Sequence, residues 1–448
     1  MSVTSSAHPA GLKRALGLQD LIFYGIVLIQ PTAPLPLFGI VSKEARGHVV
    51  TTILIAMIAM LFTAMSYGRM ARAYPAAGSA YTYVGRELHP ALGYVTGWGM
   101  ALDYMVNPIL CTVWCSKAAL NILPAVPYAG WVIFFASLFT SLNLRGIQAS
   151  ARTNRILTFA LGSVVLVFFA AAIRYLLAGP ALAAAELGRP FYNPEAFAPG
   201  PVLTGTSIAA LTYIGFDGIS TLSEEVHNPR RNVLLATVLT CLITGVLASA
   251  EVYVAQLVWP TYHDFPDVDT AFVHVAGRAG GVALLQLVNF SLVVATIGSG
   301  TGAQLGAARL LYSMGRDNAI PRRFFGVVEP KRSIPQNNVL FLGALTLAGA
   351  FVMSFQLAAE LLNFGAFIAF MGVNLAALTH YYVRSARKQL RYLAPPVLGF
   401  VTCFFIWWGL GSTAKLAGGI WLAFGILYGA IRMKRLDLRL QTSEIPEE

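Results

Sequence analysis

Charged residues are what this sequence has least of. Only 11% of its 448 residues are Asp, Glu, Lys or Arg, whereas 56% are hydrophobic and the mean hydropathy is +0.65. A soluble domain of this size needs more polar surface than that, so the composition predicts a polytopic membrane protein in contact with the lipid bilayer. The formal net charge of +11 does not predict nucleic-acid binding, because the basic residues lie in short loops between apolar spans.

The chain also lacks the patterns that catalysis, a metal centre or a disulfide framework would need. The four cysteines, Cys111, Cys115, Cys241 and Cys403, fall within apolar spans and show no zinc or disulfide spacing. The seven histidines lie in or near loops, and neither His-Glu-x-x-His nor Gly-x-Ser-x-Gly occurs. We therefore expect no enzyme, no metal site and no organic cofactor.

Twelve apolar windows are long enough to cross a bilayer, so we predict an all-α fold with twelve transmembrane helices. They lie near 17–41, 49–72, 92–116, 129–144, 155–178, 203–222, 233–258, 281–312, 338–354, 357–381, 393–411 and 415–432. The first window is too long for a signal-peptide core and has no small-residue cleavage site, so we interpret it as a membrane helix. A single transmembrane domain is expected over residues 1–448.

The basic residues predict an orientation. With both termini in the cytoplasm, 24 of the 31 Lys and Arg residues fall on the cytoplasmic side and seven fall outside. This asymmetry follows the positive-inside rule and agrees with an even number of spans. We expect a multi-pass protein of the cytoplasmic (inner) membrane with short cytoplasmic tails. Nothing in the chain predicts an oligomeric state.

Two windows cannot form continuous helices. The first contains the run 29–36 (IQPTAPLP), where three prolines remove donors and clash with the preceding turn. The sixth contains the run 213–218 (YIGFDG), whose Asp217 costs roughly 2.5–3.5 kcal/mol at the centre of a membrane helix. Paired breaks in two repeats are typical of the midplane site of a secondary transporter. The alternative is that Pro and Gly are simply common in membrane helices.

The breaks and the third window supply the candidate substrate-binding residues. From the breaks these are Ile29, Gln30, Thr32, Tyr213, Gly215, Phe216 and Asp217. In the third window Asp103 shares a helical face with Asn107, and the adjacent Tyr104 can present its hydroxyl or ring to a ligand cation. The alternative for Asp103 and Tyr104 is an interhelical polar contact, which we also expect of Asn363 and Asn374 in the tenth window.

The sequence is compatible with either H⁺ or Na⁺ as the coupling ion. In the eighth window Ser299 and Thr301 either allow close helix packing or ligate a sodium ion. Alternatively, Asp103 or Asp217 carries a proton. Glu251 lies close to the outer end of the seventh window, where we expect a hydrated vestibule.

Motifs along nearly the whole chain resemble those of the amino acid–polyamine–organocation permeases. They lie at 62–68, 74–83, 97–98, 102–104, 215–217, 223–225, 228–229, 315–318, 321 and 363–366. Within this superfamily, the stretches 39–42, 221–225 and 309–318 are most similar to the putrescine-importer branch.

This resemblance implies a LeuT-type fold with alternating access around the first, third, sixth, eighth and tenth helices. Two inverted five-helix repeats would occupy about 17–178 and 203–381, the first and sixth helices would be discontinuous, and two extra helices would lie at about 393–432. In amino acid members a Gly-x-Gly break binds the substrate carboxylate through backbone N–H groups, but Pro31 and Pro34 have none. That departure favours an amine without a carboxylate.

The expected function is import of a small organic amine, putrescine or a related polyamine, by ion-coupled (H⁺) secondary active transport. The alternative is a permease for cationic or small neutral amino acids. Many relatives that carry amino acids also have an acid where Asp217 lies, so Asp217 marks the superfamily's site more firmly than it marks polyamines. Some relatives place a lysine in the fifth window, but 159–163 has none, which puts proton coupling by that route in doubt.

Overall fold

The computed structural model describes residues 16–74, 79–145, 151–316, 320–329, 334–386 and 388–433. The predicted terminal tails lie outside these residues, as do parts of the motifs at 74–83 and 315–318. All regular secondary structure in the described part of the chain is helical, which confirms the predicted all-α class.

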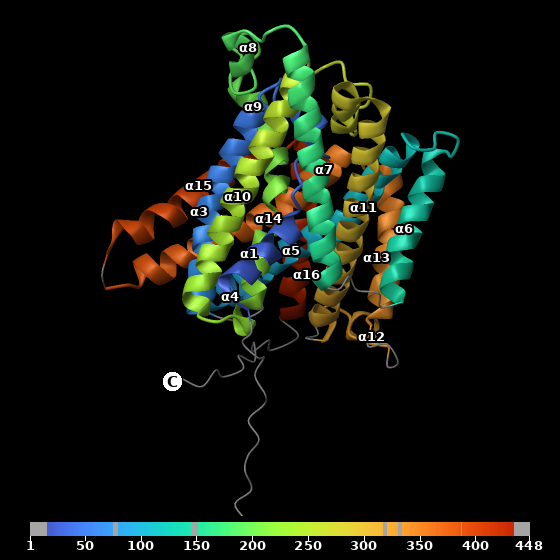
Figure 1. The fold of residues 1–448 in the computed structure, drawn as a ribbon. Helices are drawn as coiled ribbons and strands as arrows, with labels where there is room; N and C mark the ends of the chain where they lie inside the picture. The colour runs from blue at the N-terminus through green and yellow to red at the C-terminus, as the bar shows by residue number, and fades with distance from the viewer. Residues whose placement is uncertain are drawn as a thin grey trace, which may run out of the picture.

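The elements form one helical bundle, with α8 near one end and α4 and α12 near the other (Figure 1). In chain order they are α1 (Leu18–Ile29), α2 (Phe38–Glu44), α3 (Val49–Ala73), α4 (Ser79–Glu87), α5 (Pro90–Leu120), α6 (Tyr128–Leu144), α7 (Ala151–Ala178), α8 (Ala184–Gly188), α9 (Pro199–Ala209), the 3₁₀ helices η1 (Ala210–Tyr213) and η2 (Phe216–Glu225), α10 (Pro229–Val258), α11 (Ala271–Arg316), α12 (Arg322–Phe325), α13 (Gln336–Val352), α14 (Phe355–Leu378), the π-helical turn η3 (Thr379–Val383), α15 (Leu390–Trp408) and α16 (Ser412–Met433).

Among the described residues, eight helical stretches are long and apolar enough to cross a membrane. They lie in α3, α7, α9 to η2, α10, α11, α14 to η3, α15 and α16. Three shorter apolar helices, α1, α6 and α13, occupy further predicted windows. The chain is therefore a membrane protein with several spans.

The structure adds detail that the apolar windows did not predict. α11 begins ten residues before the expected eighth window, and Gly281 interrupts it with a φ of 73° and a ψ of −171°. Such a backbone conformation is accessible mainly to glycine. The short helices α4, α8 and α12 lie in segments that we expected to be linkers.

Both predicted interruptions are present. α1 ends at Ile29, Gln30 has a positive φ of 69°, and the chain then turns through 31–37 before α2 begins. α9 passes into η1, after which Ile214 is extended and Gly215 has a φ of 119°. The prolines and glycines thus interrupt the helices where the sequence indicates that they should.

The helix that carries Asp103 is fixed by a close backbone contact. A Cβ atom at Gly365 of α14 would lie 2.3 Å from the Gly99 carbonyl oxygen of α5 and 3.2 Å from the Asp103 nitrogen. Only glycine allows two helices to approach so closely here. α5 is therefore held firmly against α14.

The predicted interhelical contacts of α14 are confirmed. Asn363 donates to the Ser207 carbonyl of α9 over 2.6 Å, and Asn374 donates to the Thr63 hydroxyl of α3 over 3.1 Å. Each amide satisfies a polar group inside the apolar bundle, which is why these residues are tolerated there.

The close contact predicts that Gly365→Ala is destabilising. The new methyl group meets backbone rather than a flexible side chain, so α5 and α14 must separate, and we expect a loss of about 1–3 kcal/mol in unfolding free energy. The melting temperature of the purified protein in detergent measures this loss. Gly162→Ala on α7 is the matched control, because nothing lies within 4 Å of the added Cβ. Equal melting temperatures for the two variants would contradict the close contact.

Candidate functional site

The two interruptions touch one another. A Cβ atom at Gly215 would lie 3.4 Å from the Leu28 carbonyl of α1, and one at Gly218 would lie 2.6 Å from Leu28 Cδ1. At the other end of α1, the His227 N–H donates to the Leu16 carbonyl over 2.9 Å, so α1 runs along η2. The end of α1 and the start of η2 therefore enclose one region.

Asp217 lies in the first turn of η2. Its carboxylate interacts with the backbone N–H groups of Gly215, Asp217 and Gly218. These N–H groups lie at the interruption at Gly215, where η2 begins, and the start of a helix favours negative charge. The interruption thus offsets part of the free energy needed to hold a carboxylate in an apolar bundle.

Four more polar side chains gather around Asp217. α5 brings Asp103 and Tyr104 within electrostatic range of the Asp217 carboxylate. Tyr67 of α3 and Tyr83 of α4 interact with the same carboxylate. The structure therefore brings together the predicted residues Asp103, Tyr104 and Asp217, and it adds two tyrosines that the sequence did not single out.

Aromatic rings support this group of polar residues. Phe216 is fully buried, with its ring centroid 5.5 Å from that of Tyr67 and 5.2 Å from that of Phe370. The Tyr104 ring packs on α11, since a Cβ atom at Gly306 would lie 3.1 Å from its Cε1. Phe216 thus anchors η2 while the absence of a side chain at Gly306 leaves room for Tyr104.

Tyr213 lies in a different environment from the other candidates. It is fully buried, and its hydroxyl donates to the Ile53 carbonyl of α3 over 2.9 Å. A Cβ atom at Gly245 of α10 would lie 3.0 Å from that hydroxyl. Tyr213 therefore packs between α3 and α10, and its polar atom is already satisfied by the protein.

The candidates at the first interruption are mostly enclosed. Ile29 and Thr32 are buried, and Gln30 donates to the Ala295 carbonyl of α11 over 3.3 Å. Gln30 also adopts a positive φ, which residues other than glycine rarely do. The segment thus joins α1 to α11 through a residue in an unusual backbone conformation.

The first interruption has few free backbone donors. The N–H groups of Ala33, Leu35 and Leu37 each donate to the carbonyl three residues earlier, over 3.1 to 3.2 Å. The prolines at 31, 34 and 36 have no N–H. Within 30–37, all of which the structure describes, the Thr32 N–H is then the one backbone donor without a backbone acceptor.

The hydroxyls of the eighth window have protein partners. Ser299 forms a side-chain hydrogen bond with Cys111 of α5, and Thr301 donates to the Ile297 carbonyl of its own helix over 2.7 Å. A Cβ atom at Gly300 would lie 2.9 Å from the Cys111 Cβ. These contacts favour the packing interpretation, and sodium ligation stays a prediction.

A contact between η2 and α4 was not predicted. The Ser220 hydroxyl donates to the Asp217 carbonyl over 2.7 Å and lies 3.3 Å from the Ser79 hydroxyl of α4. The site is therefore linked to a short helix that hydropathy does not detect.

The far end of α4 carries a buried acid that the sequence analysis also missed. Glu87 is fully buried and accepts hydrogen bonds from the Tyr74 hydroxyl at 2.7 Å and from His380 Nδ1 at 2.8 Å, and an Arg384 nitrogen forms an ion pair with its other carboxyl oxygen at 2.9 Å. These partners are up to 297 positions away in the chain, so no local pattern could reveal them. Glu87 fastens α4 to the end of α14.

The expected environment of Glu251 was wrong. Instead of facing a hydrated vestibule, Glu251 has no exposed surface, and neither carboxyl oxygen has a hydrogen-bond partner in the described part of the chain. The apolar window around Glu251 correctly predicted a long helix. Hydropathy alone could not show which face of α10 is covered by its neighbours.

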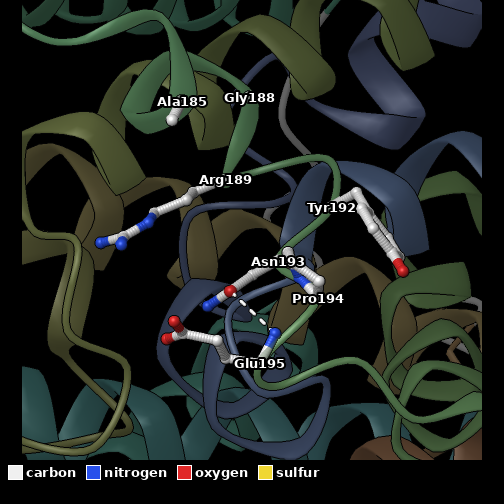
Figure 2. A pocket seen from close by; sticks show the side chains of 7 residues that line it. All are labelled: Ala185, Gly188, Arg189, Tyr192, Asn193, Pro194 and Glu195. Atoms are coloured by element: carbon white, nitrogen blue, oxygen red, sulfur yellow. Dashed lines mark hydrogen bonds between the residues drawn. The ribbon is translucent and has the colours of Figure 1, made fainter.

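A surface hollow of about 450 Å³ lies elsewhere, at the α8 end of the bundle (Figure 2). It is lined by residues between Ala185 and Glu195, with the Glu195 N–H donating to the Asn193 side chain. None of the predicted site residues lines it. Its position in the loop between α7 and α9 separates it from the region around Asp217.

The region around Asp217 contains mainly hydrogen-bond acceptors rather than donors. It contains two carboxyl groups, and the carboxyl end of α1, whose partial negative charge favours cations, lies beside it. The available N–H groups are mostly used by the protein itself. Such a site suits a ligand that donates hydrogen bonds and carries positive charge.

Known proteins resemble this chain over nearly its whole length. A family model described as "Amino acid permease" matches residues 37–430. The low-affinity putrescine importer PlaP of Escherichia coli is 34% identical over 436 residues, which cover 95% of this chain and 95% of that protein. The branched-chain amino acid permease BcaP of Lactococcus lactis subsp. cremoris is 28% identical over 459 residues, or 94% of this chain and 96% of that protein. These matches confirm the resemblance to the amino acid–polyamine–organocation superfamily, and the chain belongs to the amino acid permease family of transporters.

Proposed function

We propose that the protein imports a small organic amine, putrescine or a related polyamine, by alternating access coupled to proton entry. The observation that carries this proposal is the convergence of Asp217 and Asp103, on η2 and α5, in one acceptor-rich region. A diamine brings two ammonium groups, and charge-assisted hydrogen bonds to carboxylates are among the strongest available in proteins. Each ammonium can then be matched by a carboxylate.

The distribution of backbone donors supports an amine over an amino acid. A carboxylate substrate needs free N–H groups, but the turn hydrogen bonds and three prolines leave Thr32 as the main candidate at the first interruption. The donors at the second interruption already face the Asp217 carboxylate. A buried carboxylate without partners is unfavourable, so amino acids should bind poorly here.

We further propose twelve spans in a LeuT-type arrangement. Together with α5, the eight candidate stretches and the three shorter apolar helices make twelve spans, with α1 and α2 sharing one. The proposed domain has repeats at about 17–178 and 203–381 and extra helices at about 393–432. Both termini would lie in the cytoplasm and the chain in the inner membrane, which the distribution of basic residues supports.

The alternative is a permease for cationic or small neutral amino acids. A specific observation favours it: a relative that is 28% identical over 94% of the chain is a branched-chain amino acid permease. The more similar relative, at 34% identity, is a putrescine importer. The two relatives therefore define the two substrate classes that an uptake experiment compares.

The first experiment tests Asp217. Asp217→Asn removes the charge but keeps the shape, so we expect putrescine affinity to fall about 10- to 100-fold, as the loss of a charged hydrogen bond predicts. Uptake of labelled putrescine into proteoliposomes measures it. Asp264→Asn is the control, because Asp264 is exposed in the loop before α11 and should leave uptake unchanged. Full uptake by Asp217→Asn would show that Asp217 does not bind the amine.

A ligand panel separates the two substrate classes. We expect diamines to compete with labelled putrescine and to raise the melting temperature of the purified protein, while cationic and branched-chain amino acids do neither. A ligand at 100 times its dissociation constant stabilises the folded state by about 2.7 kcal/mol, which is readily measured. Stabilisation by an amino acid alone would favour the alternative.

Two tyrosines provide a sharper test of the site. Tyr213→Phe removes the hydrogen bond from its hydroxyl to the Ile53 carbonyl, so we expect about 1 kcal/mol of lost stability and unchanged putrescine affinity. Tyr104→Phe should leave the melting temperature nearly unchanged and weaken putrescine binding. Melting and competition measurements on both variants check this. The reverse pattern would place Tyr213 rather than Tyr104 against the substrate.

A further inference from the structure

Glu251 is the one carboxyl group in α10, and the site described above does not use it. We propose that Glu251 is a proton-binding site, separate from the amine site, through which proton entry drives transport. The proposal rests on the proposed transport function for its coupling role. Its physical basis is the burial of Glu251, its lack of partners and its place in the bundle.

The environment of Glu251 favours a bound proton. Its side chain has no exposed surface, and neither carboxyl oxygen has a hydrogen-bond partner among the residues that the structure describes. Transfer of an unpaired carboxylate into such surroundings costs several kcal/mol or more, so the group takes up a proton instead. Asp217 differs, because backbone N–H groups surround its carboxylate.

Two other buried acids, Glu87 and Glu360, have partners for their carboxyl groups. Glu87 accepts three side-chain hydrogen bonds or ion-pair contacts, from Tyr74, His380 and Arg384. Glu360 accepts from the Gln356 side chain at 3.0 Å and from the Gly411 N–H at 2.9 Å. Among these three acids, Glu251 alone lacks a partner for both carboxyl oxygens, and a buried polar group without partners calls for an explanation.

The position of Glu251 connects it to the first interruption. Thr240 of α10 contacts α1, because its hydroxyl would lie 2.7 Å from a Cβ atom at Gly25. Glu251 follows Thr240 by eleven residues, about three helical turns, and so lies on the same face of α10. α1 and α10 begin near each other, at the Leu16–Val226 bridge. At the height of Glu251 along the axis of α10, α1 has therefore ended, and the neighbouring chain is the 30–37 segment.

The nearby titratable groups leave Glu251 unpaired. On the elements packed against α10, the phenol of Tyr213 bonds to Ile53, and Arg278 of α11 donates to the Tyr175 hydroxyl of α7 over 3.1 Å. His274 of α11 lies 3.5 Å from the Thr270 hydroxyl.

Further charged groups on these elements are Asp20, Arg69, Arg72, Arg174, Asp217, Arg309 and Arg316. None of the described titratable groups interacts electrostatically with Glu251. Its protonation therefore depends on water access rather than on a fixed counter-charge.

The coupling step is a simple proton exchange. Glu251 is seven residues from the end of α10 at Val258, or about 10 Å along the axis. In the proposed orientation this is the outer end. One proton from outside binds the carboxylate, forming an O–H bond, and the same proton leaves to the cytoplasm once the bundle has opened inward. Movement of the 30–37 segment would change the access of water to Glu251.

The transport experiment uses the full-length protein in proteoliposomes, with labelled putrescine, one pH unit of gradient (acid outside) and the membrane potential clamped to zero. With one proton per substrate, the wild type should accumulate putrescine about tenfold, since one pH unit corresponds to a tenfold ratio. In vesicles that contain the Glu251→Gln variant, the internal putrescine concentration should rise only until it equals the external concentration. Accumulation by Glu251→Gln equal to that of the wild type would overturn the proposal.

Glu360→Gln is the matched control. Glu360 is also buried, but its carboxyl group has protein partners. We therefore expect the Glu360→Gln variant to accumulate putrescine as the wild type does. Loss of accumulation in both variants would mean that removing any buried acid impairs the protein, and that result also contradicts a specific role for Glu251. If the wild type carries neither amines nor amino acids, the proposed transport function itself fails.

A spectroscopic measurement tests the bound proton without transport. The infrared difference between wild type and Glu251→Gln, recorded on purified protein near neutral pH, should contain the carbonyl stretch of a protonated carboxylic acid. A carboxylate band in its place would show that Glu251 is ionised and would overturn the proposal even if Glu251→Gln folded poorly in vesicles.

Discussion

The free energy of a carboxyl group in an apolar helix bundle is the constraint on which the rest of the structure depends. In an unbroken helix the N–H groups donate to carbonyl groups of the same helix, so none is left to stabilise a carboxylate at its centre. The interruption at Gly215 brings backbone N–H groups to the Asp217 carboxylate, and α1 ends beside it. Glu87 and Glu360 are stabilised by side chains and loops instead. These three acids are therefore stabilised at helix ends or by groups from other segments, whereas Glu251 lies within the regular helix α10 without such partners.

Close helix contacts hold the interrupted segments in place. Irregular backbone inside a membrane is stable only when protein covers it. Phe216 provides cover for η2 through its contacts with Tyr67 and Phe370, while the approach of Gly365 to Gly99 fixes the helix that carries Asp103. The acid-bearing face of α5 is thereby presented to η2. Rigid helices around two irregular segments are suited to a site whose access can change on either side.

Hydropathy and proline chemistry predicted more of the fold than of the site. Apolar windows located most of the long helices, and the prolines after Gln30 and the glycine at 215 marked both interruptions, because these are local effects. For Tyr213, proximity to Asp217 in the sequence does not reveal that its hydroxyl donates to the Ile53 carbonyl. Contacts between distant segments, such as Glu87 with His380, have no local signal. For the same reason the buried face of Glu251 was not foreseen.

The balance of donors and acceptors connects the fold to selectivity. Three prolines and three turn hydrogen bonds leave the first interruption poor in N–H groups, and Asp217 uses those of the second. An ammonium group needs acceptors, which the site has, whereas an amino acid also needs donors for its carboxylate. Discrimination would then come from an unsatisfied carboxylate rather than from better contacts with the amine, because a buried group left unpaired is penalised strongly. A diamine avoids that penalty since both of its ends are donors.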